Sequence, residues 1–159
     1  MKNNPIRTAG IVIKDNKILL IHRQKNGKEY YVFPGGSVEK NETNEEALIR
    51  EIKEETSIKV EINRLVYVHD YQTSQQYYYL CEYHGGRPQL ASGSIEKQRM
   101  KTKNDFYQPL WVDISRLSGL LLYPLEIRDW LISDLKNGFP SKPRKAKLKI
   151  SDLRQDLIE

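Results

Sequence analysis

Three glutamates follow a pair of glycines at a spacing that could form a site for a divalent cation. Glu51, Glu54 and Glu55 have the i, i+3, i+4 spacing that places side chains on one face of a helix. Gly35 and Gly36 precede them, and glycine lets the backbone approach an ion or a phosphate closely. Mg²⁺ prefers oxygen ligands from carboxylates, water and substrate phosphates. The pattern favours a metal site that binds phosphate, and a solvated acidic face is the alternative.

The helix that carries these glutamates is predicted to begin near Asn44. Thr43 can serve as its N-cap, because Glu46 lies three residues later and completes a capping box. The aliphatic residues that fall on the side expected to dock on a core are Leu48, Ile49 and Ile52. The glutamates are predicted to lie on another side of this helix.

This stretch resembles the Nudix box, the signature of MutT-like hydrolases that act on a nucleoside diphosphate linked to another moiety. The matching positions are Gly36, Glu42, Arg50, Glu51, Ile52, Glu54, Glu55 and Ile58. Ser57 departs from the pattern, because the family has a second glycine there. A glycine would suit the left-handed residue that ends a helix. Serine is expected to cost on the order of 1 kcal/mol of local stability, with no metal ligand lost.

The resemblance implies an α/β (α+β) fold, a Nudix-type α/β/α sandwich with a mixed β-sheet over residues 5–138. It also implies hydrolysis of a phosphoanhydride by water, assisted by Mg²⁺ or Mn²⁺. The groups that would hold the ions are the side chains of Glu51, Glu54 and Glu55 and the carbonyl of Gly36. The ions would lower the pKa of a bound water and neutralise charge on the diphosphate. Arg50 would orient the glutamates, and Glu42 would either support the loop or bind metal through water.

The sequence offers three candidates for the general base and three residues for substrate contacts. Glu54 and Glu55 are candidates for the base. Glu96 is another, because it is the only carboxylate before Asp105 in a polar loop predicted to cover the site. The expected substrate contacts are Arg23, Gly35 and Gly36. Arg23 resembles the basic residue that many Nudix proteins place at this strand end to face phosphate, and a surface arginine is the alternative. Loops outside the box would recognise the group linked to the nucleoside diphosphate, and the sequences of these loops do not identify that group.

Strand patterns surround the predicted helix. The expected strands are Arg7–Ile13, Lys17–Arg23, Tyr30–Phe33, Lys59–Asp70, Gln75–His84 and Tyr107–Ile114. A second helix is predicted over Leu125–Lys136, with Pro124 at its first turn and Gly138 as the residue that ends it. The run Ile18–Ile21 is continuously apolar, so its strand should be covered on both faces. The tyrosines of Tyr77–Tyr83 could stack on bases, but cross-strand packing is the favoured interpretation.

Composition is consistent with one domain. The chain has 159 residues and a formal charge of +5. Residues 141–159 account for +3 of that charge and are interpreted as a basic extension of a domain spanning residues 1–140. Part of this extension is expected to dock, on the same subunit or on a partner in a homodimer. The single cysteine, Cys81, is predicted to be buried, and it excludes an internal disulfide.

The sequence predicts that the protein is a cytoplasmic enzyme with a small-molecule nucleotide substrate. No apolar run approaches the length of a membrane span, and no secretory pattern is visible at the N-terminus. Two alternatives belong to other classes. A Nudix-like fold could serve as a non-catalytic nucleotide sensor, although the glutamates are then expected to be lost. The basic extension could instead bind RNA or direct hydrolysis to RNA 5′ ends.

Overall fold

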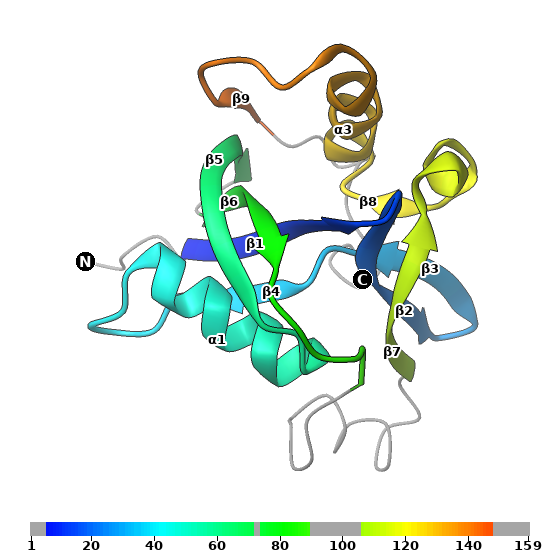
Figure 1. Cartoon of the computed structure of the whole chain (residues 1–159), viewed down its shortest axis with the longest axis horizontal. Helices are drawn as coiled ribbons and strands as arrows, with labels where there is room; N and C mark the ends of the chain where they lie inside the picture. The colour runs from blue at the N-terminus through cyan, green and yellow to red at the C-terminus, as the bar shows by residue number, and fades with distance from the viewer. Residues whose placement is uncertain (1–5, 72–73, 90–105, 148–159) are drawn as a thin grey trace.

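The computed structural model describes residues 6–71, 74–89 and 106–147. In Figure 1 the strands form one curled sheet, and α1 and α3 lie apart from each other. The strands are β1 (Ile6–Lys14), β2 (Lys17–Lys25), β3 (Lys28–Val32), β4 (Gly35–Ser37), β5 (Val60–Tyr71), β6 (Ser74–Tyr83), β7 (Phe106–Asp113), β8 (Leu122–Tyr123) and β9 (Arg144–Lys147). The helices are α1 (Asn44–Thr56), the 3₁₀ helix η1 (Ile114–Gly119) and α3 (Leu125–Asn137).

The sheet is mixed, as predicted. Its order is β8-β3-β2-β1-β6-β5-β9, with β4 paired to β1 and β7 paired to β2. The pairs β1–β6, β3–β8 and β5–β9 are parallel, and the other pairs are antiparallel. The β1–β2 hairpin turns at Asp15 and Asn16, both with positive φ, the conformation that a tight hairpin turn requires. The observed fold confirms the expected α/β/α sandwich.

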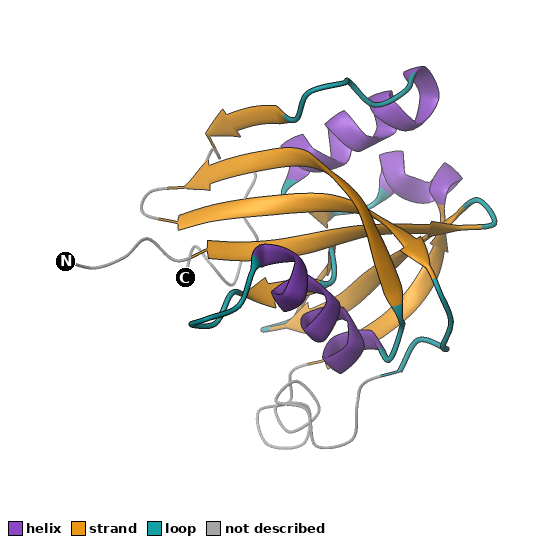
Figure 2. Ribbon diagram, turned by 60° about the vertical axis from the view of Figure 1, so that its left-hand side comes forward, coloured by secondary structure: helices purple, strands orange, loops and turns teal. Residues whose placement is uncertain are grey.

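The two helices cover opposite faces of the sheet (Figure 2). On one face, Leu48 and Ile52 of α1 pack on residues of β1, β2 and β6. On the other, Ile127 and Leu131 of α3 pack on a second cluster, which includes Tyr67 and residues of η1. This second helix and its stop at Gly138 match the sequence prediction. Within residues 6–71, 74–89 and 106–147, no helix is long and apolar enough to cross a membrane.

Burial in the central strands agrees with the sequence interpretation. The residues of the Ile18–Ile21 run are fully buried, as a strand covered on both faces requires. Tyr78 packs against α3, whereas Tyr79 and Cys81 face α1. These two tyrosines are therefore core residues rather than a stacking platform. Cys81 is buried as predicted, and burial raises the pKa of its thiol to about 12.

Several local predictions were wrong. Ile49 was expected to dock on the core, but it is 44% exposed because it lies 100° around the helix from Leu48. The stretch Gly35–Ser37 was not predicted as a strand, but it forms β4 and pairs with β1. The short elements η1, β8 and β9 were not predicted. Pro124 is the N-cap of α3 rather than part of its first turn.

Candidate functional site

Helix α1 begins and ends as its sequence indicates. Thr43 is the N-cap, and both hydrogen bonds of the capping box with Glu46 are present. The helix ends at Ser57, which adopts the left-handed conformation with φ 64°. This conformation explains why glycine would suit the position. The Ser57 hydroxyl donates to the Gln89 carbonyl at 2.8 Å, an interaction that glycine could not make and that offsets part of the backbone strain.

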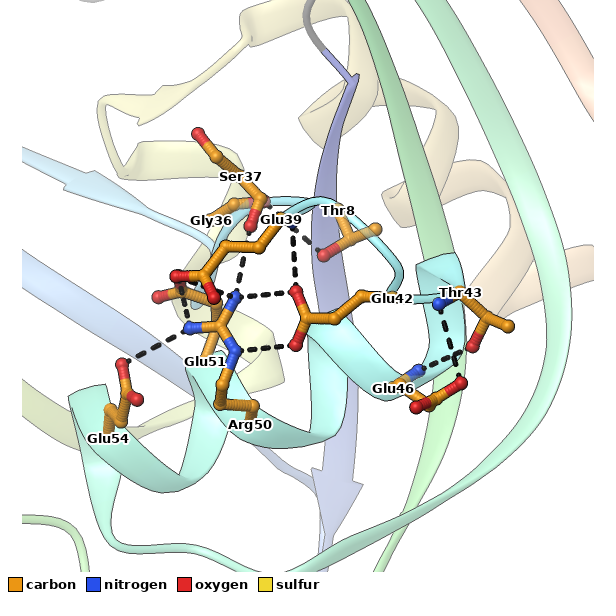
Figure 3. A network of polar contacts seen from close by, with 10 residues as sticks. All are labelled: Thr8, Gly36, Ser37, Glu39, Glu42, Thr43, Glu46, Arg50, Glu51 and Glu54. Atoms are coloured by element: carbon orange, nitrogen blue, oxygen red, sulfur yellow. Dashed lines mark hydrogen bonds and ion pairs between the residues drawn. The ribbon is translucent and has the colours of Figure 1, made fainter.

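Arg50 is the centre of the polar network beside β4 (Figure 3). Its Nε and Nη2 donate to the two oxygens of Glu42 at 2.7 and 3.0 Å, a bidentate pair. Its Nη1 donates to Glu51 at 3.0 Å and to Glu54 at 3.4 Å. Nη2 also donates to the Ser37 carbonyl at 3.2 Å. Arg50 therefore ties α1 to the loop before it and fixes the direction of two of the three box glutamates.

The network favours the ionised form of Glu42. Hydrogen bonds from Arg50, and then from the Glu39 backbone N–H, lower the pKa of Glu42 to about 2. The same carboxylate raises the pKa of Arg50, with Glu51 contributing. A guanidinium held this way cannot lose its proton at any physiological pH. Glu42 thus positions Arg50, and whether it also binds metal through water stays a prediction.

We expect the side-chain carboxyl of Glu42 to titrate near pH 2 in the folded protein. The group has a lowered pKa in the folded state, so its stabilising contribution is present above the unfolded value of 4.5. That contribution is lost as the pH falls toward 2. Carboxyl ¹³C chemical shifts followed over pH would measure this midpoint. A midpoint near 4.5 would show that the bidentate pair does not form in solution.

The two glycines of the site leave no room for a side chain. A Cβ at Gly36 would overlap the Glu51 carboxylate, with each carboxylate oxygen 2.6 Å away. A Cβ at Gly35 would overlap the carbonyl oxygen of Thr8 on β1. Gly36 is thus the contact surface on which the Glu51 carboxylate lies. The sequence indicated close backbone approach here, and the structure shows that Glu51 is the group that approaches.

The buried end of the site is formed by Glu55. This side chain is 8% exposed, and its Oε2 accepts a hydrogen bond from the Gly35 N–H at 3.1 Å. Thr8, which the sequence did not single out, donates its hydroxyl to the Gly36 carbonyl at 3.4 Å. No local pattern marks Thr8, because only the β1–β4 pairing places it there.

These groups fit a hard divalent cation. The donor set consists of carboxylates and one carbonyl, the ligand types that Mg²⁺ and Mn²⁺ prefer. Arg50 supplies one positive charge to the carboxylates of Glu39, Glu42, Glu51 and Glu54, so the cluster keeps a net negative charge. Glu54 is 53% exposed at its side chain and therefore open to solvent. The arrangement can bind a cation between a glycine backbone and an exposed carboxylate.

The other sequence-predicted site residues differ in how the structure places them. Arg23 lies on β2 and is only 5% exposed. Its guanidinium carbon lies 3.8 Å from the ring centroid of Tyr107, a cation–π distance. Arg23 is therefore not a simple surface arginine, and its contact with phosphate stays a prediction. Glu96 lies outside the described residues.

Replacing Gly36 by alanine tests the close contact with Glu51. The added methyl must displace the Glu51 carboxylate, and a shift of about 1 Å at a catalytic group can lower the rate by up to about 100-fold. We expect such a loss in kcat/KM, with destabilisation of about 1–3 kcal/mol from overpacking. Gly119→Ala is the matched control, since a Cβ there meets nothing within 4 Å. Unchanged activity in Gly36→Ala would contradict the contact.

Several known proteins similar to this chain have the same domain. The NUDIX domain model matches residues 4–129. An ADP-ribose pyrophosphatase of Methanocaldococcus jannaschii is 52% identical over 65 residues, which are 40% of this chain and 38% of that protein. An RNA pyrophosphohydrolase of Pelagibacter ubique is 28% identical over 141 residues, 76% of this chain and 84% of that protein. The match to the first relative thus covers well under half of its length.

Solved structures share the fold. The crystal structure of a NUDIX hydrolase from Nitrosomonas europaea superposes with a TM-score of 0.71 and 16% identity, covering 92% of this chain and 81% of that one. At this identity the similarity concerns the fold alone. The domain match spans most of the chain, from before β1 into α3. The chain belongs to the Nudix family.

Proposed function

We propose that the protein hydrolyses the pyrophosphate linkage of a nucleoside diphosphate derivative, of the nucleoside triphosphate or nucleotide-sugar type. The observation that carries this proposal is a set of three carboxylates: Glu51 lies against Gly36, Glu55 accepts from the Gly35 N–H, and Glu54 is held beside them by Arg50. Such a set has the oxygen donors and the net negative charge that a divalent cation and its bound phosphates require. The pyrophosphatase names of the relatives agree with this class of reaction.

In this proposal, the residues of the chain prepare the site before the substrate arrives. Arg50 holds Glu51 and Glu54 in one direction, and the Gly35 N–H holds Glu55 in another. Fixed carboxylates need no reorganisation when a cation binds, which preserves binding energy for catalysis. Glu54 is the most exposed of the three and can accept a proton from a water molecule at the surface. We therefore place the general base at Glu54, with Glu55 and Glu96 as the other candidates.

The ion that fits this site is Mg²⁺ or Mn²⁺. Its protein ligands would be Glu51, Glu54, Glu55 and the Gly36 carbonyl. When bound, such an ion makes water more acidic and neutralises charge on the phosphates. Arg50 has a different role, because its guanidinium donates hydrogen bonds to protein oxygens. It positions the carboxylates rather than the substrate.

A substrate panel tests the proposal. Purified protein would be assayed with nucleoside triphosphates, nucleotide sugars, ADP-ribose and dinucleoside polyphosphates, each with Mg²⁺, with Mn²⁺ and with EDTA. We expect metal-dependent release of a nucleoside monophosphate from at least one class. Binding without turnover across the whole panel would indicate a nucleotide sensor and would overturn the proposed enzyme.

A triphosphorylated RNA 5′ end is the second candidate substrate. The observation that favours it is the match to the RNA pyrophosphohydrolase of Pelagibacter ubique, which covers 84% of that protein. Lys145 and Lys147 are exposed on β9 and could attract an RNA backbone. This RNA would be added to the panel, with free nucleoside triphosphate as competitor. The competition shows which of the two, the RNA 5′ end or the free nucleotide, is the preferred substrate. A steep decrease of RNA affinity with salt is expected only if phosphate contacts extend beyond the first nucleotide.

A further inference from the structure

Two glutamates and a histidine converge at one end of the β5–β6 pair. Glu61 and Glu82 are directly opposite each other in the antiparallel ladder, and His84 follows Glu82 by two residues. Each side chain offers one ligand atom, and these three atoms lie within 4.8 Å of one another. Carboxylate oxygens and imidazole nitrogens are ligands of transition-metal ions, so this group has the composition of a small metal site.

The register of the two strands places the three side chains on one face of the sheet. Successive residues of a strand point to opposite faces, and Cys81 faces α1, so Glu82 and His84 point to the other face. Glu61 shares the face of its cross-strand partner. The backbone of His84 is also fixed, because its N–H donates to the Lys59 carbonyl at 2.8 Å. Strand pairing therefore brings the group together.

The distances at the imidazole match those in a tetrahedral metal site. His84 Nε2 lies 3.2 Å from Glu61 Oε2 and 3.4 Å from Glu82 Oε2. Two ligand atoms that each lie about 2.0–2.1 Å from one Zn²⁺ ion are about 3.3–3.4 Å apart when the angle at the metal is tetrahedral. Both distances from the imidazole nitrogen are thus those of ligands that share an ion.

The charges of the group favour a divalent cation. Two carboxylates directly opposite each other in a ladder repel. A single ring N–H of His84 can point at only one carboxylate oxygen, and neither 3.2 Å nor 3.4 Å is the short distance of a charge-assisted hydrogen bond. A protonated imidazole supplies one positive charge, whereas a divalent cation neutralises both carboxylates together.

The ligand set selects a different ion from that of the Gly36 site. One imidazole and two carboxylates suit Zn²⁺, whereas Mg²⁺ prefers oxygen ligands alone. The side chains of Glu61, Glu82 and His84 are 69%, 62% and 47% exposed. Water can therefore reach the fourth position of a tetrahedral ion. Three protein ligands and an open position distinguish this arrangement from a closed structural zinc site.

The group is remote from the Gly36 site. Glu82 pairs with Ile13 of β1, and Gly36 pairs with Thr8 of the same strand. The five residues from Thr8 to Ile13 span roughly 17 Å along the strand. Helix α1, which carries the box glutamates, covers the opposite face of the sheet. The two sites share no ligand and can be loaded together.

We propose that Glu61, Glu82 and His84 form a second metal site, which binds Zn²⁺ through one oxygen of each carboxylate and through Nε2 of the imidazole. The ion joins β5 to β6 at the end of their ladder. Only the folded chain brings the three side chains together, so Zn²⁺ also stabilises the fold. This inference does not depend on the hydrolase activity proposed above.

Calorimetric titration of Zn²⁺ into the full chain tests the site, with Mg²⁺ in large excess to occupy the Gly36 site. The wild type should bind one Zn²⁺ ion per chain. His84→Gln should weaken this affinity about 100-fold or more, because loss of even an outer-shell partner weakens metal binding about 10–100-fold. His22→Gln is the matched control, since His22 pairs with Glu29 on β2 and β3, and it should leave the affinity unchanged.

A second measurement needs no variant, so a folding defect cannot leave the inference undecided. X-ray absorption at the zinc edge of the wild type, loaded with one equivalent of Zn²⁺, should show one imidazole nitrogen together with oxygen ligands. All-oxygen coordination, or no Zn²⁺ site in the wild type, would overturn the inference. Folded His84→Gln with wild-type affinity would also overturn it, as would an equal loss of affinity in His22→Gln. A melting temperature that Zn²⁺ raises in the wild type and in His22→Gln, but not in His84→Gln, would support it.

Discussion

Replacing Glu55 by glutamine is expected to lower kcat/KM by about 1000-fold, and Glu54→Gln by a similar factor. A carboxylate that holds a catalytic divalent cation contributes several kcal/mol to transition-state stabilisation, and 1000-fold corresponds to about 4 kcal/mol. Glutamine has nearly the same shape, and its carbonyl oxygen can still accept the Gly35 N–H that now bonds to Glu55 at 3.1 Å. The substitution therefore removes charge and keeps the fold.

The affinity for Mn²⁺ should weaken in the same variants. Titration of Mn²⁺ followed by electron paramagnetic resonance measures it without any substrate. Asp129→Asn is the control, because Asp129 is an acidic side chain on α3, on the face of the sheet opposite α1, and is 62% exposed and paired with Arg128. If Glu54→Gln and Glu55→Gln both kept wild-type turnover and Mn²⁺ affinity, the three glutamates would be a solvated acidic face and the proposed metal site would be wrong.

The parts of this site that could be predicted are those that depend only on residues close to one another in the sequence. Thr43 and Glu46 are three residues apart, and a capping box needs nothing beyond that spacing. The spacing of Glu51 and Glu54 likewise places them where Arg50 reaches both. Ser57 was expected at a left-handed position, and the structure confirms this. Such features depend on dihedral angles within one helix, so tertiary contacts do not change them.

The parts that could not be predicted depend on contacts between distant segments. Glu55 was predicted to share one helix face with Glu51 and Glu54, but its burial was not predicted, because it depends on β4 bringing the Gly35 N–H against it. The acceptor that Gly36 provides to Thr8 follows from strand pairing over 28 residues of separation. No amphipathic pattern marks the four residues of β9, because an edge strand with basic residues at three of its four positions resembles an exposed tail. The pairing of distant strands therefore determines which polar groups come into contact.

Methionine in place of Arg144 is expected to destabilise the fold by about 2–4 kcal/mol. Arg144 Nη2 and Nε donate to the two oxygens of Asp134 at 2.7 and 3.1 Å, and the Asp134 side chain is only 1% exposed. The Tyr67 hydroxyl donates to the same carboxylate at 2.8 Å. Burial acts to raise the pKa of Asp134, but the bonds from Arg144 and Tyr67 outweigh it and the net pKa is lowered. Removing one partner of such a pair leaves a buried charge that is poorly compensated.

Urea denaturation of the wild type and of Arg144→Met measures this loss. Lys145→Met is the control, since Lys145 is an exposed neighbour on the same strand and should change stability by less than about 0.5 kcal/mol. Because the folded pKa of Asp134 is lowered, its stabilising contribution should disappear as the pH falls through the acid range, and Arg144→Met should flatten this dependence. Equal stability of the two variants would show that β9 does not dock through Arg144.

If the loss is found, deleting residues 141–159 would remove a structural ion pair together with the basic charge. A test for RNA binding by this segment should therefore replace Lys145 and Lys147 and keep Arg144.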